Sequence, residues 1–237
     1  MVRRIFKLIT TAIAVVLLST QAVFAVTMTE VAEAIKKNDM DKAFDGLQVL
    51  ANQKHPDAQF LLAMMYEKGR GTEANQEKAA EWYKAAAEQG HPSAQNNLAQ
   101  LYNQGRGVPQ DYKEAVKWFS KAADAGNATA QYNLALRYAK GEGVEKDLGK
   151  AFELYRNSAE QNNVFGQFNL AYSYATGEGT DKNMVEALRW AMLSAEKKFP
   201  RAIQFVSFLG SKMSQEEISK AEKLANEWRK DKGIGAQ

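Results

Sequence analysis

The chain has no cysteine and only four prolines among its 237 residues. Without cysteine it cannot form disulfides, thiolate metal sites or a cysteine nucleophile, nor can it be lipidated through a cysteine at the mature N-terminus. Its stability must therefore come from packing. A chain rich in alanine and poor in proline is compatible with one extended helical array as well as with one or two globular domains.

The N-terminal segment predicts a secretory signal peptide. Arg3, Arg4 and Lys7 precede the apolar run 8–18, and small residues follow up to Ala25. That run is shorter than the roughly 20 residues of a membrane-spanning helix. We expect cleavage near Val26, export to the periplasm or, as an alternative, secretion, and no stable membrane insertion after cleavage. An uncleaved membrane anchor is the competing interpretation.

The formal charge of +3 belongs entirely to this segment, because no acidic residue occurs before Glu30. Removing the three basic residues leaves 28 basic and 28 acidic residues. A mature chain without net charge lacks the positive surface that phosphate binding requires. The composition therefore argues against DNA or RNA as a partner.

Several residue types recur at an unchanging interval of 36 residues, which indicates a repeat architecture. Ala-Gln pairs begin at Ala58, Ala94 and Ala130 and continue as Gly166-Gln167. A second alanine series, followed by bulky residues, runs from Ala43 to Ala187. The repeat is marked most clearly by four Gly-x-Gly elements, at Gly69 and Gly71, Gly105 and Gly107, Gly141 and Gly143, and Gly177 and Gly179.

Each repeat predicts two helices, which we name the A helix and the B helix. The spacing of Ala58, Leu62 and Tyr66 and of their copies places apolar groups on one face of the A helix. The glycines can end this helix in the left-handed conformation. Helix N-caps for the B helices are predicted at Asn75, Asp111, Asp147 and Asn183, and Glu114 and Glu186 have capping-box spacing from the second and the fourth of these.

No helix pair can bury its apolar face alone, so neighbouring pairs must stack, and the ends of the array should be atypical. We count five repeats between residues 39 and 210. A lone helix within 26–38 and a helix within 211–230, rich in Glu and Lys on one face, are predicted to cap the array. The tail 231–237 is predicted to be disordered.

These motifs resemble the Sel-one-like repeat family of the tetratricopeptide superfamily. The closest agreement lies in Leu134 to Ala151, including Gly141-Glu142-Gly143-Val144 and Asp147, and in Leu98 to Gly126. The resemblance covers about residues 39–210. It implies an all-α fold, a right-handed α-solenoid of stacked antiparallel helix pairs with a 36-residue period, that offers its surface to another protein.

No catalytic, cofactor or metal site stands out from the repeats. His55 and His91 occupy the same inter-repeat turn, each before a proline, and turn chemistry explains them. The segment Gly69-Arg70-Gly71 follows a helix and lacks the lysine and hydroxyl of a phosphate-binding loop. No carboxylate pair and no Ser, His and Asp set breaks the repeat pattern.

The free flank of the A helices is the candidate binding site, since the resemblance implies that this flank lines a concave surface. It is polar in early repeats and aromatic in late ones, with further members at Phe165, Gln204 and Phe208. Aromatic side chains in such a groove could anchor a peptide; alternatively they pack one A helix against the next. The predicted groove residues are Phe60, Met64, Asn96, Gln100, Tyr132, Leu136, Phe168 and Tyr172.

Function is therefore expected to be that of an exported adaptor or scaffold for protein–protein interaction in the bacterial cell envelope, not that of an enzyme. One alternative is an enzyme acting on cell-wall material, with β-lactamase-like or peptidoglycan-modifying activity, which some cysteine-rich relatives suggest. The absence of cysteine weakens that link. The other alternative is a secreted factor that acts on a host or another cell.

Overall fold

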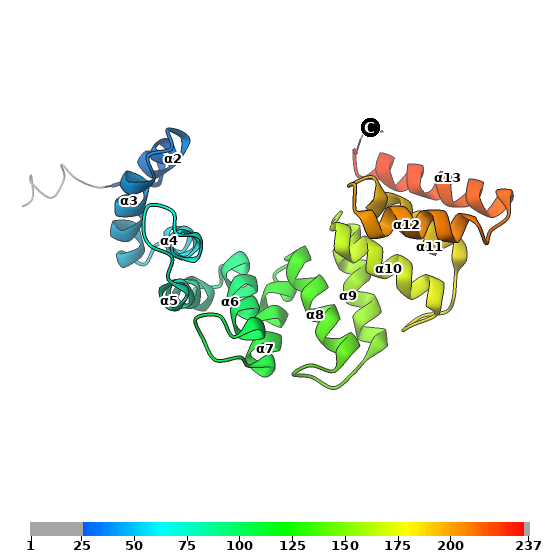
Figure 1. Cartoon of the computed structure of the whole chain (residues 1–237), viewed down its shortest axis with the longest axis horizontal. Coiled ribbons are helices and arrows are strands. Elements are labelled where there is room, and N and C mark those ends of the chain that lie inside the picture. Colours follow the sequence, from blue (N-terminus) through cyan, green and yellow to red (C-terminus); the bar gives the residue numbers. More distant parts are fainter. Residues whose placement is uncertain (1–25, 235–237) are drawn as a thin grey trace, which may run out of the picture. The chain divides into compact units, whose positions relative to one another are not determined.

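The computed structural model describes residues 26–234, and within them the chain is helical with no strand (Figure 1). The predicted signal peptide, residues 1–25, lies outside the described residues, as do residues 235–237. The described helices, in chain order, are α2 (Met28–Lys36), α3 (Met40–Asn52), α4 (Pro56–Lys68), α5 (Gln76–Glu88), α6 (Pro92–Gln104), α7 (Tyr112–Asp124), α8 (Ala128–Lys140), α9 (Leu148–Glu160), α10 (Val164–Thr176), α11 (Met184–Ala195), α12 (Pro200–Gly210) and α13 (Gln215–Asp231).

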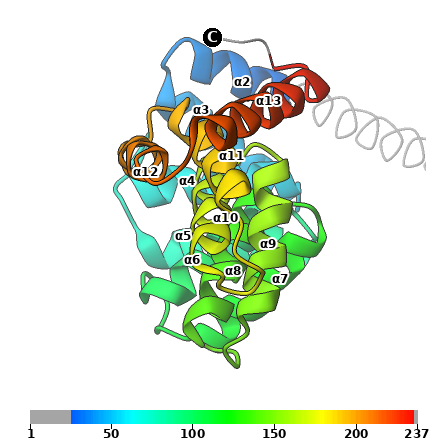
Figure 2. The same ribbon diagram turned by 90° about the vertical axis from the view of Figure 1, so that its right-hand side faces the viewer.

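The chain divides into two compact units, residues 1–85 and 86–237, with the boundary inside α5. In the first unit, α3 packs against both α2 and α4. In the second unit, each helix from α6 to α11 packs against the next one along the chain, and α13 packs against α11 (Figure 2). Each unit is therefore a stack of consecutive helix pairs, which confirms the all-α repeat fold.

The predicted N-caps of the B helices are confirmed. Asp111 accepts hydrogen bonds from the backbone amides of Lys113 and Glu114, and Asn75, Asp147 and Asn183 cap α5, α9 and α11 in the same way. The reciprocal capping-box bond does not form at α7, where the Glu114 carboxylate pairs with Lys117 at 3.0 Å. It forms instead at the two end helices, α2 and α13.

The two glycines of each Gly-x-Gly element have different tasks. The first ends its A helix in the left-handed conformation, for example Gly141 with φ 73°. The second also has a positive φ and lies against the preceding B helix. A Cβ on Gly143 would lie 2.2 Å from the Tyr112 carbonyl oxygen, and one on Gly179 would lie 2.1 Å from that of Leu148. Only glycine permits this approach.

The repeated glutamine of the Ala-Gln pair ties each A helix to the B helix before it. The Nε2 atom of Gln95 donates to the Ala87 carbonyl oxygen at 3.1 Å, a bond that recurs from Gln59 to Ala51 and from Gln131 to Ala123. These carbonyls belong to the last turn of a helix, and each also accepts a backbone amide of the turn that follows, as Ala87 does from Gly90 at 3.0 Å. The buried glutamine therefore adds a second hydrogen bond to each carbonyl oxygen.

A serine replaces the repeat's alanine at two equivalent positions, Ser158 and Ser194. The Ser158 hydroxyl donates to the Ala128 carbonyl oxygen at 2.7 Å, and the Ser194 hydroxyl donates to the Val164 carbonyl oxygen at 2.9 Å. A Cβ on Gly166 would meet the Ser158 hydroxyl at 2.6 Å, whereas the equivalent position of the last repeat is Ala202.

The C-terminal helix α13 seals the core of the second unit. Trp228 packs edge-on against Trp190, with ring centroids 5.6 Å apart, and its indole N–H donates to Glu160 at 2.8 Å. The helix runs through Asp231, so order extends beyond the expected start of the tail. Ile234 packs against the same core.

Candidate functional site

The eight predicted groove residues are distributed over both units and do not share one environment. In the first unit, Phe60 is half-buried near Tyr83, with ring centroids 5.9 Å apart, and Met64 lines a pocket. The other six lie on α6, α8 and α10 of the second unit: Asn96, Gln100, Tyr132, Leu136, Phe168 and Tyr172.

The polar part of the flank is held by amide hydrogen bonds. Asn96 is buried, and its side-chain oxygen accepts a bond from Asn133 of α8 at 3.1 Å. Its amide group donates to Asn97 at 3.2 Å. Asn96 therefore links α6 to α8 and has little capacity left for a partner. Gln100 is half-buried on the same helix.

The aromatic part forms one continuous row of rings across α8, α10 and α12. Tyr132 stacks on Phe165 at 5.5 Å, and Phe168 meets Phe205 at 5.8 Å. Phe199, at the start of α12, lies edge-on to both Phe165 and Phe168. We name this row the aromatic strip; it consists of Tyr132, Phe165, Phe168, Tyr172, Phe199, Phe205 and Phe208.

Three rings of the aromatic strip keep a large exposed surface. Phe165 and Tyr172 are each 44% exposed, and Phe208 is 56% exposed. Tyr132, Phe168 and their partners on α12 are half-buried. The strip thus packs consecutive A helices together, as the alternative interpretation holds, and also presents ring faces to solvent. Neighbouring exposed apolar groups are typical of interaction surfaces.

Cations lie at one end of the aromatic strip. Burial raises the pKa of the Tyr132 hydroxyl, and the positive charges of Arg137 and Arg201 oppose part of that rise. Arg201 is exposed. Arg137 is buried and pairs with Glu142 at 2.7 Å. Tyr132 therefore remains a neutral hydroxyl that can donate or accept a hydrogen bond at physiological pH.

The strip supplies shape and exposed apolar area. Among residues 26–234, no group of three or more His, Asp or Glu side chains is arranged to hold a metal ion. None of the helices in that range has the length and apolar character needed to cross a bilayer. His91 caps α6, since its Nδ1 atom accepts the Ala94 amide at 3.1 Å.

Two rings of the strip, Phe199 and Phe205, were not among the predicted site residues. Phe199 occupies the inter-repeat turn before Pro200, and Phe205 stands where earlier repeats have asparagine at 97, 133 and 169. This change from asparagine to phenylalanine is visible in the sequence and indicates an additional ring on the last A helix. Asn133 at this position donates a hydrogen bond to Asn96 of α6, whereas Phe205 extends the row of rings onto α12.

Stacked helix pairs with an apolar strip on the A helices define the class of the protein as an α-solenoid of the repeat-module type. The model of the Sel1 repeat matches residues 56–91, 92–127, 128–163 and 164–199, and the chain belongs to this family. The fifth repeat that we counted lies outside these four matches. Sel1 repeats are generally protein-interaction modules, and their fold is typically a non-enzymatic scaffold.

Solved structures similar to this chain include two that are 30% identical to it. A protective antigen of uropathogenic Escherichia coli with an SLR fold is 30% identical, with a TM-score of 0.75; the match covers 83% of this chain and 44% of that one. A Sel1 repeat protein from Oxalobacter formigenes is 30% identical, with a TM-score of 0.71, covering 87% and 84%. This chain thus spans less than half the length of the first relative. No curated protein matches it.

Proposed function

We propose that the protein is an exported adaptor of the bacterial cell envelope that binds a protein or peptide partner through the aromatic strip. The observation that carries this proposal is that three rings of one continuous row, Phe165, Tyr172 and Phe208, are about half exposed to solvent. A few aromatic anchors supply most of the affinity in many interfaces. Truncating such an anchor commonly costs about 2 kcal/mol or more.

Two features support export. The segment 1–25 has the basic start, apolar run and small residues of a signal peptide. The similar Escherichia coli protein is described as a protective antigen, a description that fits a protein exposed outside the cytoplasm. Fractionation, with mass spectrometry of the mature N-terminus, should find the protein in the periplasm beginning near Val26. Retention in the cytoplasm with an intact leader would overturn this part.

Binding is tested by photocrosslinking in intact cells. A photoreactive phenylalanine at Tyr172 or Phe208 should give discrete adducts, whereas the same group at Val49, which is 40% exposed on α3, should give none. Excess unlabelled protein should compete for the adducts. A competitor carrying alanine at Phe165, Tyr172 and Phe208 should fail to do so. Equal adducts from Val49, or equal competition by the triple variant, would refute the role of the strip.

A further inference from the structure

A small pocket opens in the first unit between α2, α3 and α4. Its volume is about 160 Å³, and its walls are apolar, formed by Ile35 of α2, Met40 of α3, and Leu61 and Met64 of α4. A cavity of about 150 Å³ is large enough to take one benzene molecule. The pocket therefore matches one leucine or phenylalanine side chain.

The pocket lies beside α2, which is shorter than the A helix that follows it. Here α2 has 9 residues where α4 has 13, and Ile35 near its end is 40% exposed. Methionine side chains are flexible and adapt their shape to an incoming apolar group.

Two cations stand at the mouth of this apolar pocket. Lys68 at the end of α4 and Arg70 in the following loop both line it, and both are exposed. Neither has an ion-pair partner among residues 26–234. The neighbouring carboxylate, Glu67, accepts a hydrogen bond from the Tyr83 hydroxyl at 2.7 Å. The mouth thus presents two positive charges without a contact ion pair among the described residues.

We propose that this pocket receives one apolar side chain of a partner segment that carries Asp or Glu immediately beside it. The apolar walls select the side chain, and Lys68 and Arg70 select the acidic neighbours. The chain's own leader is a poor occupant, because its basic residues Arg3, Arg4 and Lys7 would approach two like charges. The site lies in a different unit from the aromatic strip and would act independently of it.

Methionine methyl groups report on this site directly. With the protein labelled at its methionine methyls, Met40, Met64 and Met65 report on the pocket, and Met184, Met192 and Met213 report on the second unit. The probes are three capped hexapeptides, Gly-Ser-Leu-Asp-Asp-Gly and its versions with Asn-Asn or Lys-Lys in place of Asp-Asp. A fourth probe carries serine in place of leucine in the acidic peptide.

The acidic leucine peptide should shift the methyl signals of Met40, Met64 and Met65 alone. Its dissociation constant should be about 10-fold lower than that of the basic peptide, with the neutral one between them, because each exposed charge pair contributes modestly. The preference should disappear in 1 M NaCl, where the screening length is about 3 Å. The serine probe should bind about 10- to 100-fold more weakly, the value of burying one leucine side chain.

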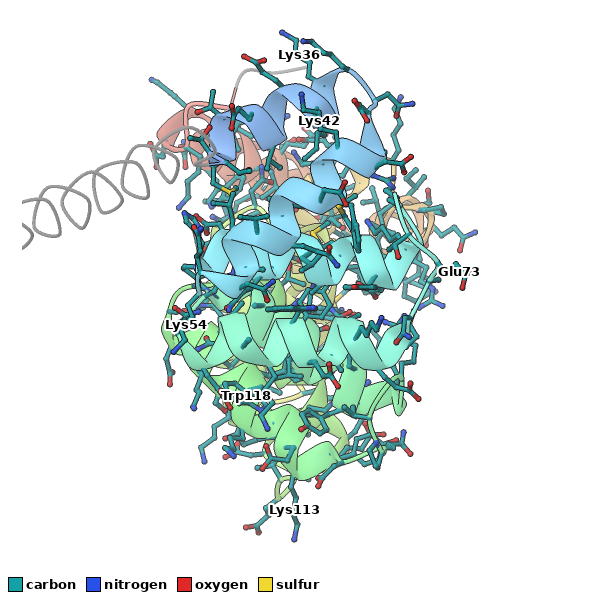
Figure 3. All side chains as sticks on the ribbon, turned by 90° about the vertical axis from the view of Figure 1, so that its left-hand side faces the viewer. Lys36, Lys42, Lys54, Glu73, Lys113 and Trp118 are labelled. Carbon is teal, nitrogen blue, oxygen red and sulfur yellow. The ribbon has the colours of Figure 1, made fainter. Side chains whose placement is uncertain are left out.

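Charge reversal supplies the matched variants. Lys68→Glu with Arg70→Glu should invert the order of the acidic and basic peptides, whereas Lys54→Glu should leave it unchanged. Figure 3 shows Lys54 and Glu73, three residues after Arg70, at opposite edges of the first unit. All three substituted residues are exposed, so the fold should persist, and circular dichroism verifies this.

Three results would overturn the proposal: equal binding of the acidic and basic peptides, equal shifts at Met184 and Met192, or an unchanged order in the double variant. Shifts of Met40 and Met64 that depend on protein concentration without peptide would assign the pocket to a second copy of the chain, and would also overturn it. The triple variant of the aromatic strip should bind the acidic peptide normally, so failure of either proposal is distinguishable from failure of the other.

Discussion

Replacing Gly143 by alanine tests whether the second glycine of the Gly-x-Gly element holds consecutive repeats together. Gly143 has φ +75°, and its backbone lies on the first turn of α7. A Cβ there would lie 2.2 Å from the Tyr112 carbonyl oxygen and 2.4 Å from its carbon. A rotamer change cannot relieve this overlap, because the obstacle is backbone. The loop and α7 must move apart.

The expected cost has two parts. A left-handed backbone costs a non-glycine residue about 1–2 kcal/mol. Forcing packed elements apart costs about 1–3 kcal/mol more, so the free energy of unfolding should fall by about 2–5 kcal/mol. Gly126→Ala is the control. Gly126 has φ +83° with nothing within 4 Å of its would-be Cβ, so this variant should lose only the first part, about 1–2 kcal/mol.

Urea unfolding, followed by circular dichroism and tryptophan fluorescence, measures the difference. Repeat proteins can unfold in segments, so the two signals are compared before a free energy is derived. Gly143→Ala should have the lower midpoint of the two variants. If Gly143→Ala is no more destabilising than Gly126→Ala, the close approach of loop and helix does not hold the repeats together, and our explanation of the second glycine fails.

Three further predictions concern stability. Gly166→Ala should lower the free energy of unfolding by about 1–3 kcal/mol despite the better helix propensity of alanine. One of the clashing atoms is the Ser158 hydroxyl oxygen, at 2.6 Å from the new Cβ, so a double-mutant cycle with Ser158→Ala should show partial recovery of stability. Lys198→Gly should raise the melting temperature through a gain of up to about 1 kcal/mol, since Lys198 has φ +59°. Trp228→Phe should remove the hydrogen bond to Glu160, lower the free energy of unfolding by about 0.5–1.5 kcal/mol and speed amide hydrogen exchange in α13. Unchanged exchange would contradict the role of Trp228 in holding α13 against the core.

The interval of 36 residues predicted the helix pairs, their caps and their order, because each of these depends on neighbours a few residues away. Asp111 caps α7 through amides two and three residues on, and Gly141 ends α8 through its own φ. Such local geometry is legible in sequence. The periodic apolar faces likewise require stacking of neighbouring helix pairs, so the sequence alone indicates the fold class.

Contacts between repeats were decided by the tertiary structure. That Gly143 lies on the Tyr112 carbonyl, and that Gln95 reaches the Ala87 carbonyl, depends on how successive helix pairs meet. The same holds for the flank, where helical periodicity placed Asn96 and Tyr172 on one face. Only packing against neighbouring helices buried the first and left the second 44% exposed. Sequence fixes the direction of a side chain on its helix, but burial depends on what the adjoining helices bring against it.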